Sequence, residues 1–250
     1  MKELWNSFKE KKWFYLGIVI GLFFLTGMIY VLYYSDLFLL KEIEVKGDPE
    51  FSKEEVIKLS GLHGGERLYR ISLEKIRKKL MQDPRIGNVI IVRRLPCSLE
   101  IIIKQREPVG IVKKRGGYYL IDKHGILIKR AEKEHFSHYP LIIVKNEEEE
   151  KRLLNFLSWL KRTRKYLPVF DNLKEVILKE DRVIFITKNS GIKIYFPVKS
   201  KKSWKYFYRN LDRIMAYLHA RKKLMEKVEI IRLDYPVGEA LIKFKNGNRG

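Results

Sequence analysis

Hydrophobic positions divide the chain into one long apolar run and a remainder of mixed character. The run covers residues 13–34, WFYLGIVIGLFFLTGMIYVLYY, and its 22 residues include no Asp, Glu, Lys, Arg or His. A helix of this length spans roughly 33 Å, enough to cross a hydrocarbon core of about 30 Å. Aromatic residues lie near both ends of the run, as at membrane interfaces. The pattern predicts a transmembrane helix and disfavours a buried core helix, which is rarely apolar on every face.

Charges beside this run predict its orientation. Residues 1–12 carry four Lys and two Glu, and two of the Lys adjoin the run, whereas Asp36 and Lys41 are the first charges beyond it. Positive residues near a span favour the cytoplasmic side. We therefore expect a single-pass protein of the cytoplasmic membrane, with residues 1–12 as a cytoplasmic tail and the bulk outside. The alternative is a cleaved signal peptide, but residues 33–37 offer no small-x-small cleavage site.

The segment after the run has the pattern of a small α+β domain. Ser52 and Glu55 form a capping box that opens a helix, and a second helix must stop before Pro84. The expected elements are a strand near 42–46, helices over 53–60 and 73–83, and strands over 88–94 and 98–105. This order, strand, helix, helix, strand, strand, suits a small sheet with both helices on one face.

The rest of the chain predicts a second, larger domain. Strands are expected over 109–113, 118–122, 175–178, 182–187, 192–196, 228–233 and 239–244, and amphipathic helices over 147–165 and 203–221. The strands do not alternate regularly with helices, so we expect a mixed α+β domain on an antiparallel-rich sheet rather than a βαβ fold.

Motifs in both domains resemble the FtsQ/DivIB family of cell-division proteins. Residues 83–101, DPRIGNVIIVRRLPCSLEI, are similar to a family signature in which a strand, an R-x-x-P-x-x-L turn and a second strand follow one another. Arg93, Pro96 and Leu99 match this signature, while the aromatic residue usual near position 85 or 86 is missing. Residues 119–127 and 139–142 resemble later family motifs.

This resemblance implies a domain organisation and a role. It divides the chain into a cytoplasmic tail (1–12), a transmembrane helix (13–34), a POTRA domain of β-α-α-β-β order (39–106) and an FtsQ/DivIB-type β domain (107–250). It also implies a non-enzymatic scaffold of the divisome that links early and late division proteins at the septum. The implied partners are FtsB, called DivIC in Gram-positive bacteria, and FtsL, with FtsW and FtsI reached indirectly.

The resemblance also implies a partner-binding site near the C-terminus. Residues 231–241, IRLDYPVGEAL, resemble the closing D-L-R-Y-x-x-G-x-A strands of the family, although an Asp stands where the family often has Arg. In the family this terminal sheet edge receives an added strand from FtsB, and the adjoining strand contributes a basic residue. The expected partner-binding residues are Tyr235, Arg232, Asp234, Gly238, Ala240 and, as the basic residue, Arg182.

Net charge leaves one further interpretation open. The chain carries +22, of which residues 1–12 contribute +2, so the exterior carries +20. Anionic lipid, wall polymer or nucleic acid would suit such charge, but export disfavours nucleic acid. A solvated Lys- and Glu-rich surface is the favoured explanation. Cys97 is the sole cysteine, so no internal disulfide forms.

Catalytic motifs are missing from the sequence. There is no G-x-S-x-G and no glycine-rich phosphate loop. The pair His135 and His138 lacks a neighbouring acid and a third ligand, and Cys97 lacks an adjacent base. The sequence predicts no enzyme, cofactor or metal site. The alternatives left open are a membrane-anchored cell-wall enzyme, a POTRA-type export accessory and a basic polymer-binding module.

Overall fold

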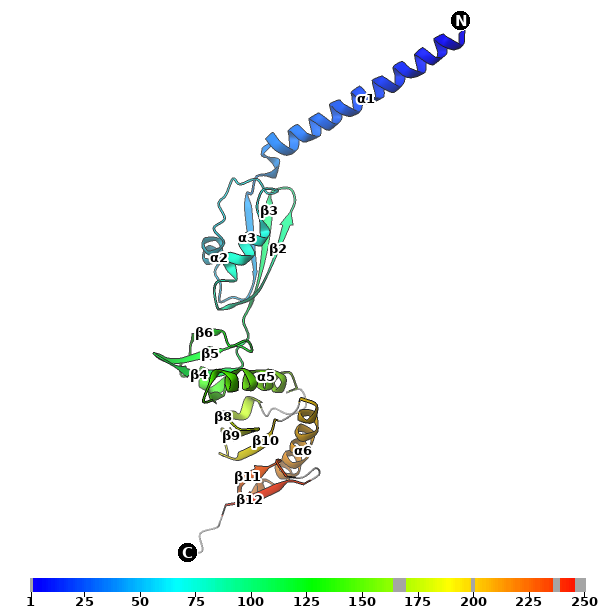
Figure 1. Cartoon of the computed structure of the whole chain (residues 1–250). Coiled ribbons are helices and arrows are strands. Elements are labelled where there is room, and N and C mark those ends of the chain that lie inside the picture. The colour runs from blue at the N-terminus through cyan, green and yellow to red at the C-terminus, as the bar shows by residue number, and fades with distance from the viewer. Residues whose placement is uncertain (1, 164–169, 199–200, 236–238, 246–250) are drawn as a thin grey trace, which may run out of the picture. The chain divides into compact units, whose positions relative to one another are not determined.

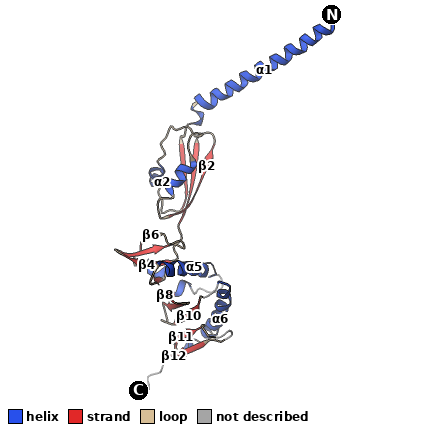
Figure 2. Ribbon diagram, in the orientation of Figure 1, coloured by secondary structure: helices blue, strands red, loops and turns tan. Residues whose placement is uncertain are grey.

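The computed structural model describes residues 2–163, 170–198, 201–235 and 239–245 (Figure 1). The chain divides into two compact units, residues 1–105 and residues 106–250. Helices and strands are mixed in both units (Figure 2), which confirms the predicted α+β class.

The first unit begins with α1, a helix over Lys2–Tyr34. Its stretch Phe14–Val31 has a mean hydropathy of 2.2, and none of it is buried against the protein. Apolar side chains in full exposure on a helix of this length are consistent with a single membrane crossing. A short 3-10 helix, η1 (Asp36–Phe38), follows.

The rest of the first unit is a three-stranded sheet with two helices. Its elements are β1 (Glu42–Gly47), α2 (Lys53–Ser60), α3 (Leu73–Leu80), β2 (Ile86–Arg94) and β3 (Ser98–Gln105). The strand order is β1-β3-β2, with β1 parallel and β2 antiparallel to β3. Alternate residues of β3, Leu99, Ile101 and Ile103, share one core with Val56 of α2 and Ile76 of α3. Both helices therefore pack on the same face, as predicted.

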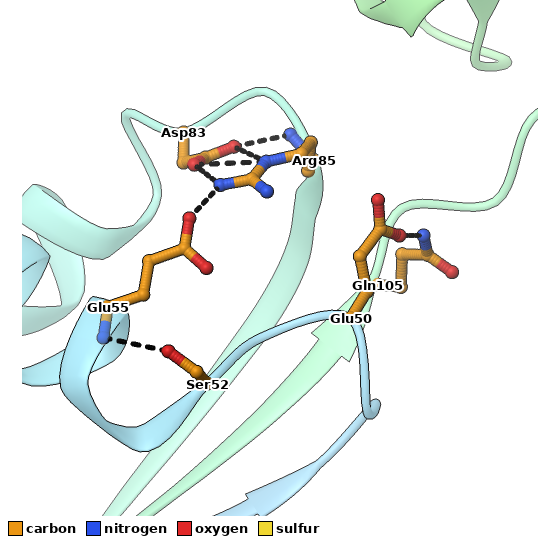
Figure 3. A network of polar contacts seen from close by, with 6 residues as sticks. All are labelled: Glu50, Ser52, Glu55, Asp83, Arg85 and Gln105. Carbon is orange, nitrogen blue, oxygen red and sulfur yellow. Dashed lines mark hydrogen bonds and ion pairs between the residues drawn. The ribbon is translucent and has the colours of Figure 1, made fainter.

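Helix α2 has the N-cap that the sequence predicts. The Ser52 hydroxyl accepts the Glu55 N–H at 3.2 Å, and Gly61 ends the helix with a left-handed φ of 66°. The Glu55 carboxylate lies toward the start of β2, where it accepts the Arg85 guanidinium at 2.6 Å (Figure 3). The first turn of α2 is thus tied to a distant strand.

Arg85 is the centre of this polar network. Its Nη2 also lies 2.7 Å from Asp83 (Figure 3). Its guanidinium stacks over the Phe51 ring, 5.0 Å from the ring centroid. Hydrogen bonds from Arg85 hold the pKa of Asp83 below its ordinary value, against the opposing effect of burial. At the same end of the sheet, Gln105 donates a hydrogen bond to Glu50.

Arg93, a residue of the predicted turn motif, has a structural role. Its Nε donates to the Leu68 carbonyl at 3.0 Å, and its Nη2 donates to the Ile71 carbonyl at 2.6 Å. These bonds satisfy two carbonyls of the loop between α2 and α3 and fix that loop to the end of β2.

The second unit contains a large mixed sheet. In the described part of the chain its elements are β4 (Gly110–Lys114), β5 (Gly117–Ile121), β6 (Leu127–Arg130), α4 (His135–His138), β7 (Leu141–Ile143), α5 (Glu147–Thr163), η2 (Phe170–Asn172), β8 (Leu173–Lys179), β9 (Arg182–Thr187), β10 (Lys193–Pro197), α6 (Lys201–His219), α7 (Lys222–Met225), β11 (Val228–Arg232) and β12 (Leu241–Phe244). The strand order is β12-β11-β10-β9-β8-β7-β4-β5-β6.

Three strand pairs in this sheet are parallel, namely β4–β7, β7–β8 and β10–β11, and the others are antiparallel. The sheet is antiparallel-rich, as predicted. However, β7–α5–β8 and β10–α6–β11 are two βαβ units that the sequence analysis did not expect. The strand β7, only three residues long, carries too little pattern to be recognised by periodicity.

Helices α5 and α6 cover one face of this sheet. The buried stripe predicted for α5, Leu153, Phe156, Leu157 and Leu160, packs in the same core as Leu211, Met215 and Leu218 of α6. A smaller cluster formed by Ile111, Leu120 and Ile128 lies on β4, β5 and β6. Since Val112 belongs to the large core and Ile111 to the small one, the sheet is covered on both faces near β4.

Candidate functional site: the C-terminal sheet edge

The site expected from the sequence lies at one edge of the large sheet. Strand β12 is the last strand of the described sheet and pairs with β11 in antiparallel register. Leu241 and Phe244 on β12 are 40% and 39% exposed, whereas Ile242 packs against the large core. The edge therefore carries exposed apolar side chains on a strand whose register is held by one partly buried residue.

Asp234, directly after β11, brings together three of the predicted residues. Arg232 donates to it through Nε at 3.0 Å and Nη2 at 2.8 Å, and Nη1 of Arg182 lies 3.0 Å from the same carboxylate. The Arg232 guanidinium also stacks between two rings, 5.3 Å from that of Tyr195 and 5.5 Å from that of Tyr235. We call these five residues the Asp234 cluster.

Electrostatic interactions in the Asp234 cluster favour the ionised forms of Asp234 and Arg232. Hydrogen bonds from Arg232 hold the pKa of Asp234 below its ordinary value, and desolvation opposes this effect without reversing it. The same contact raises the pKa of Arg232. Because only 10% of the Asp234 side chain is exposed, the carboxylate depends on its two arginines for compensation.

The structure corrects the predicted placement of Arg182. This residue begins β9, which is separated from β12 by β10 and β11, so it does not lie on the strand adjoining the edge. Its long side chain nevertheless reaches Asp234. The basic residue on the adjoining strand is Arg232, at the end of β11.

The remaining predicted residues are less closely associated. Ala240 is exposed and directly precedes β12, which begins two residues later than predicted. Gly238 lies outside the described residues. Tyr195, which the sequence analysis did not identify, joins the cluster because β10 is the parallel neighbour of β11 and pairs Tyr195 with Arg232. Only knowledge of that strand pairing would have identified it.

A hollow of about 690 Å³ adjoins the Asp234 cluster. Its lining combines charged groups from the β8–β9 turn and β11 with apolar groups from β10 and α6, and comprises Glu180, Asp181, Arg182, Pro197, Ser203, Phe207, Arg232, Asp234 and Tyr235. Such a lining suits a side chain with both apolar and polar parts.

The residues considered for chemistry do not belong to the Asp234 cluster. His135 accepts the N–H of Glu132 on Nδ1 at 2.9 Å, and Cys97 is a half-buried free thiol. Within the described ranges, no group of three or more His, Cys, Asp or Glu side chains is arranged to hold a metal ion.

Two family models match the chain. Residues 38–106 match the FtsQ-type POTRA domain, and residues 110–233 match the C-terminal domain of the cell division protein FtsQ/DivIB. The second match ends directly before Asp234.

Curated relatives carry the same names. The cell division protein FtsQ of Syntrophotalea carbinolica is 25% identical over 236 residues, covering 88% of this chain and 82% of that protein. The FtsQ of Geobacter sp. (strain M21) is 27% identical over 209 residues, covering 80% of this chain and 74% of that protein. The cell division protein DivIB of Clostridium acetobutylicum is 35% identical over 92 residues, only 37% of each chain.

Together, the apolar N-terminal helix, the POTRA domain and the mixed-sheet domain define a cell division protein with one candidate membrane helix. The chain belongs to the FtsQ/DivIB family.

Proposed function

We propose that the protein is a non-enzymatic scaffold of the divisome whose β12 edge receives an added strand from a partner. The position of β12 at the end of the described sheet carries this proposal. An edge strand presents unpaired N–H and C=O groups, and an extended partner segment continues the ladder through them. Exposed Leu241 and Phe244 add apolar contacts that select the partner's side chains.

Family membership supports the identity of the partners. FtsB, or DivIC, supplies the added strand in this proposal, FtsL binds in the same complex, and FtsW and FtsI are reached through them. The protein acts at the division septum with its N-terminus in the cytoplasm and both folded units outside. Tyr235 and the rest of the Asp234 cluster, with Ala240, form the flank of the docking edge.

A binding measurement tests the proposed edge. The full chain in detergent is titrated with the extracytoplasmic part of FtsB or DivIC from the same organism. Leu241→Glu places a carboxylate on the edge that receives the strand, so Kd should rise about tenfold or more. Tyr235→Glu should act in the same direction, and wild-type binding should persist at high salt because backbone hydrogen bonds dominate.

Leu127→Glu is the matched control. Leu127 is 36% exposed on β6, the strand at the opposite edge of the same sheet, so this variant carries the same chemical change away from the proposed site. Equal loss of binding in the Leu127 and Leu241 variants, or binding that vanishes at modest salt, would contradict strand addition at β12.

A further inference from the structure

One end of the first unit gathers three loops next to α1. They are residues 35–41, 63–71 and 93–98, which we call the membrane-proximal rim. Arg67 Nη1 donates to the Ser35 carbonyl at 3.4 Å, directly after α1 ends. The Leu68 N–H donates to the Phe38 carbonyl at 2.8 Å, and the Lys41 N–H donates to the Cys97 carbonyl at 2.9 Å. The rim is therefore a connected surface rather than three independent loops.

The net positive charge of residues 35–105 lies on this rim. Its three loops contain five basic and two acidic residues, whereas the other positions between 35 and 105 contain nine of each. The basic residues are Lys41, Arg67, Arg70, Arg93 and Arg94. The unit thus has a balanced body and a basic end, and that end is the one joined to α1.

Exposed apolar side chains have the same distribution. Beyond α1, four large hydrophobic side chains are exposed in the described part of the first unit, and three of them lie on the rim: Leu37, Tyr69 and Leu95. Leu95 at the tip of the β2–β3 hairpin is 73% exposed. The fourth, Ile90, lies in the middle of β2 and is 52% exposed.

Chain connectivity limits how far the rim can lie from the bilayer. Leu37 is three residues beyond the end of α1, so its Cα lies within about 11 Å of that end. A tether this short gives the rim a high effective concentration at the lipid surface. Basic side chains attract anionic headgroups, and leucine and tyrosine side chains enter the interface.

We propose that the membrane-proximal rim binds the surface of the bilayer crossed by α1, with Lys41 and Arg70 on anionic phospholipid headgroups and with Leu95 and Tyr69 in the interface. This contact is a second attachment to the membrane, separate from α1 itself. It rests on α1 crossing a bilayer and is independent of the β12 edge, so either proposal can fail without the other.

Fluorescent probes in the reconstituted full chain test this contact. In a Cys97→Ser background, Leu95→Cys carries an environment-sensitive nitrobenzoxadiazole label, and Ile90→Cys carries the same label as the matched control. The two positions are exposed hydrophobic residues of one hairpin, about 17 Å apart along the strand. In vesicles of equal parts phosphatidylcholine and phosphatidylglycerol, the probe at 95 should emit at shorter wavelength and be quenched by nitroxide lipids. The probe at 90 should remain open to aqueous quenchers.

Charge reversal tests the role of the headgroups. The double variant Lys41→Glu with Arg70→Glu should lower the equilibrium constant for contact about tenfold or more, and Lys75→Glu with Lys78→Glu on α3 should leave it unchanged. Equal aqueous quenching of both probes would overturn the proposal. Contact that is equally strong in pure phosphatidylcholine, or insensitive to the rim variant, would overturn the assignment to anionic headgroups.

Discussion

Asp234 is the acceptor on which the C-terminal cluster depends, because Arg232 and Arg182 both donate to it. Its lowered pKa links the cluster to pH. A carboxylate whose pKa is lower in the folded than in the unfolded chain, where it is about 3.9, stabilises the fold above that value. This stabilisation is lost as the pH falls through the folded-state pKa.

Asp234→Asn should therefore lower the free energy of unfolding of the second unit by about 1–3 kcal/mol at neutral pH, since two arginines lose a charged acceptor. The difference between wild type and variant should shrink below pH 4 or so. Urea unfolding of the full chain in detergent at several pH values measures both effects. Asp181→Asn is the control because that side chain is 54% exposed, and an equal loss in the control would contradict the special role of Asp234.

Sequence analysis could identify only part of this cluster. Arg232 and Asp234 are two positions apart at a strand end, a spacing that places side chains on one side of the chain. Arg182 lies 52 positions from Asp234, and its reach across β10 to the residues after β11 follows from tertiary structure alone. The Asp at position 234 looked like a departure from the family motif, yet it organises the cluster.

At the scale of elements, alternate apolar residues of β3 face the core of the first unit. Ile101 is fully buried in the core of the first unit, while Ile90 on the neighbouring β2 is 52% exposed. Ile101→Asp should unfold the first unit because a lone carboxylate would enter the core, and Ile90→Asp should change the free energy of unfolding by less than about 1 kcal/mol. Thermal unfolding of the two variants, monitored by circular dichroism, measures both effects. Similar melting curves for both variants would contradict the register.

Elements with strong local signals could be predicted from the sequence, and elements defined by distant partners could not. Helix α2 has Ser52 at its start and Gly61 at its end, so local hydrogen bonds fix both boundaries. Strand β7 has three residues and is a strand only because β4 and β8 lie on either side of it. The β7–α5–β8 unit was missed for this reason, whereas β10, α6 and β11 were each predicted and only the parallel pairing of the two strands was not.

For the whole molecule, the charge beside α1 predicts that both folded units lie outside the cytoplasm. In a Cys97→Ser background, Lys123→Cys on an exposed turn of the second unit should react with a membrane-impermeant maleimide in intact spheroplasts. Ser7→Cys in the N-terminal tail should react only after permeabilisation. The reverse pattern would show the opposite orientation.

The strand order of the large sheet has a mechanical consequence. The chain enters the second unit at β4, and a partner on β12 would pull from the far end of the row β12-β11-β10-β9-β8-β7-β4. A force applied across the strands is carried by each of these hydrogen-bonded ladders in turn. The ladders with the fewest pairs therefore limit the force that the sheet withstands. The β4–β7 ladder has two register pairs, and the β7–β8 and β10–β11 ladders have three each. Tension applied between β4 and β12 would therefore strain these three seams first, and the core that α5 and α6 build over the sheet determines how much tension it withstands.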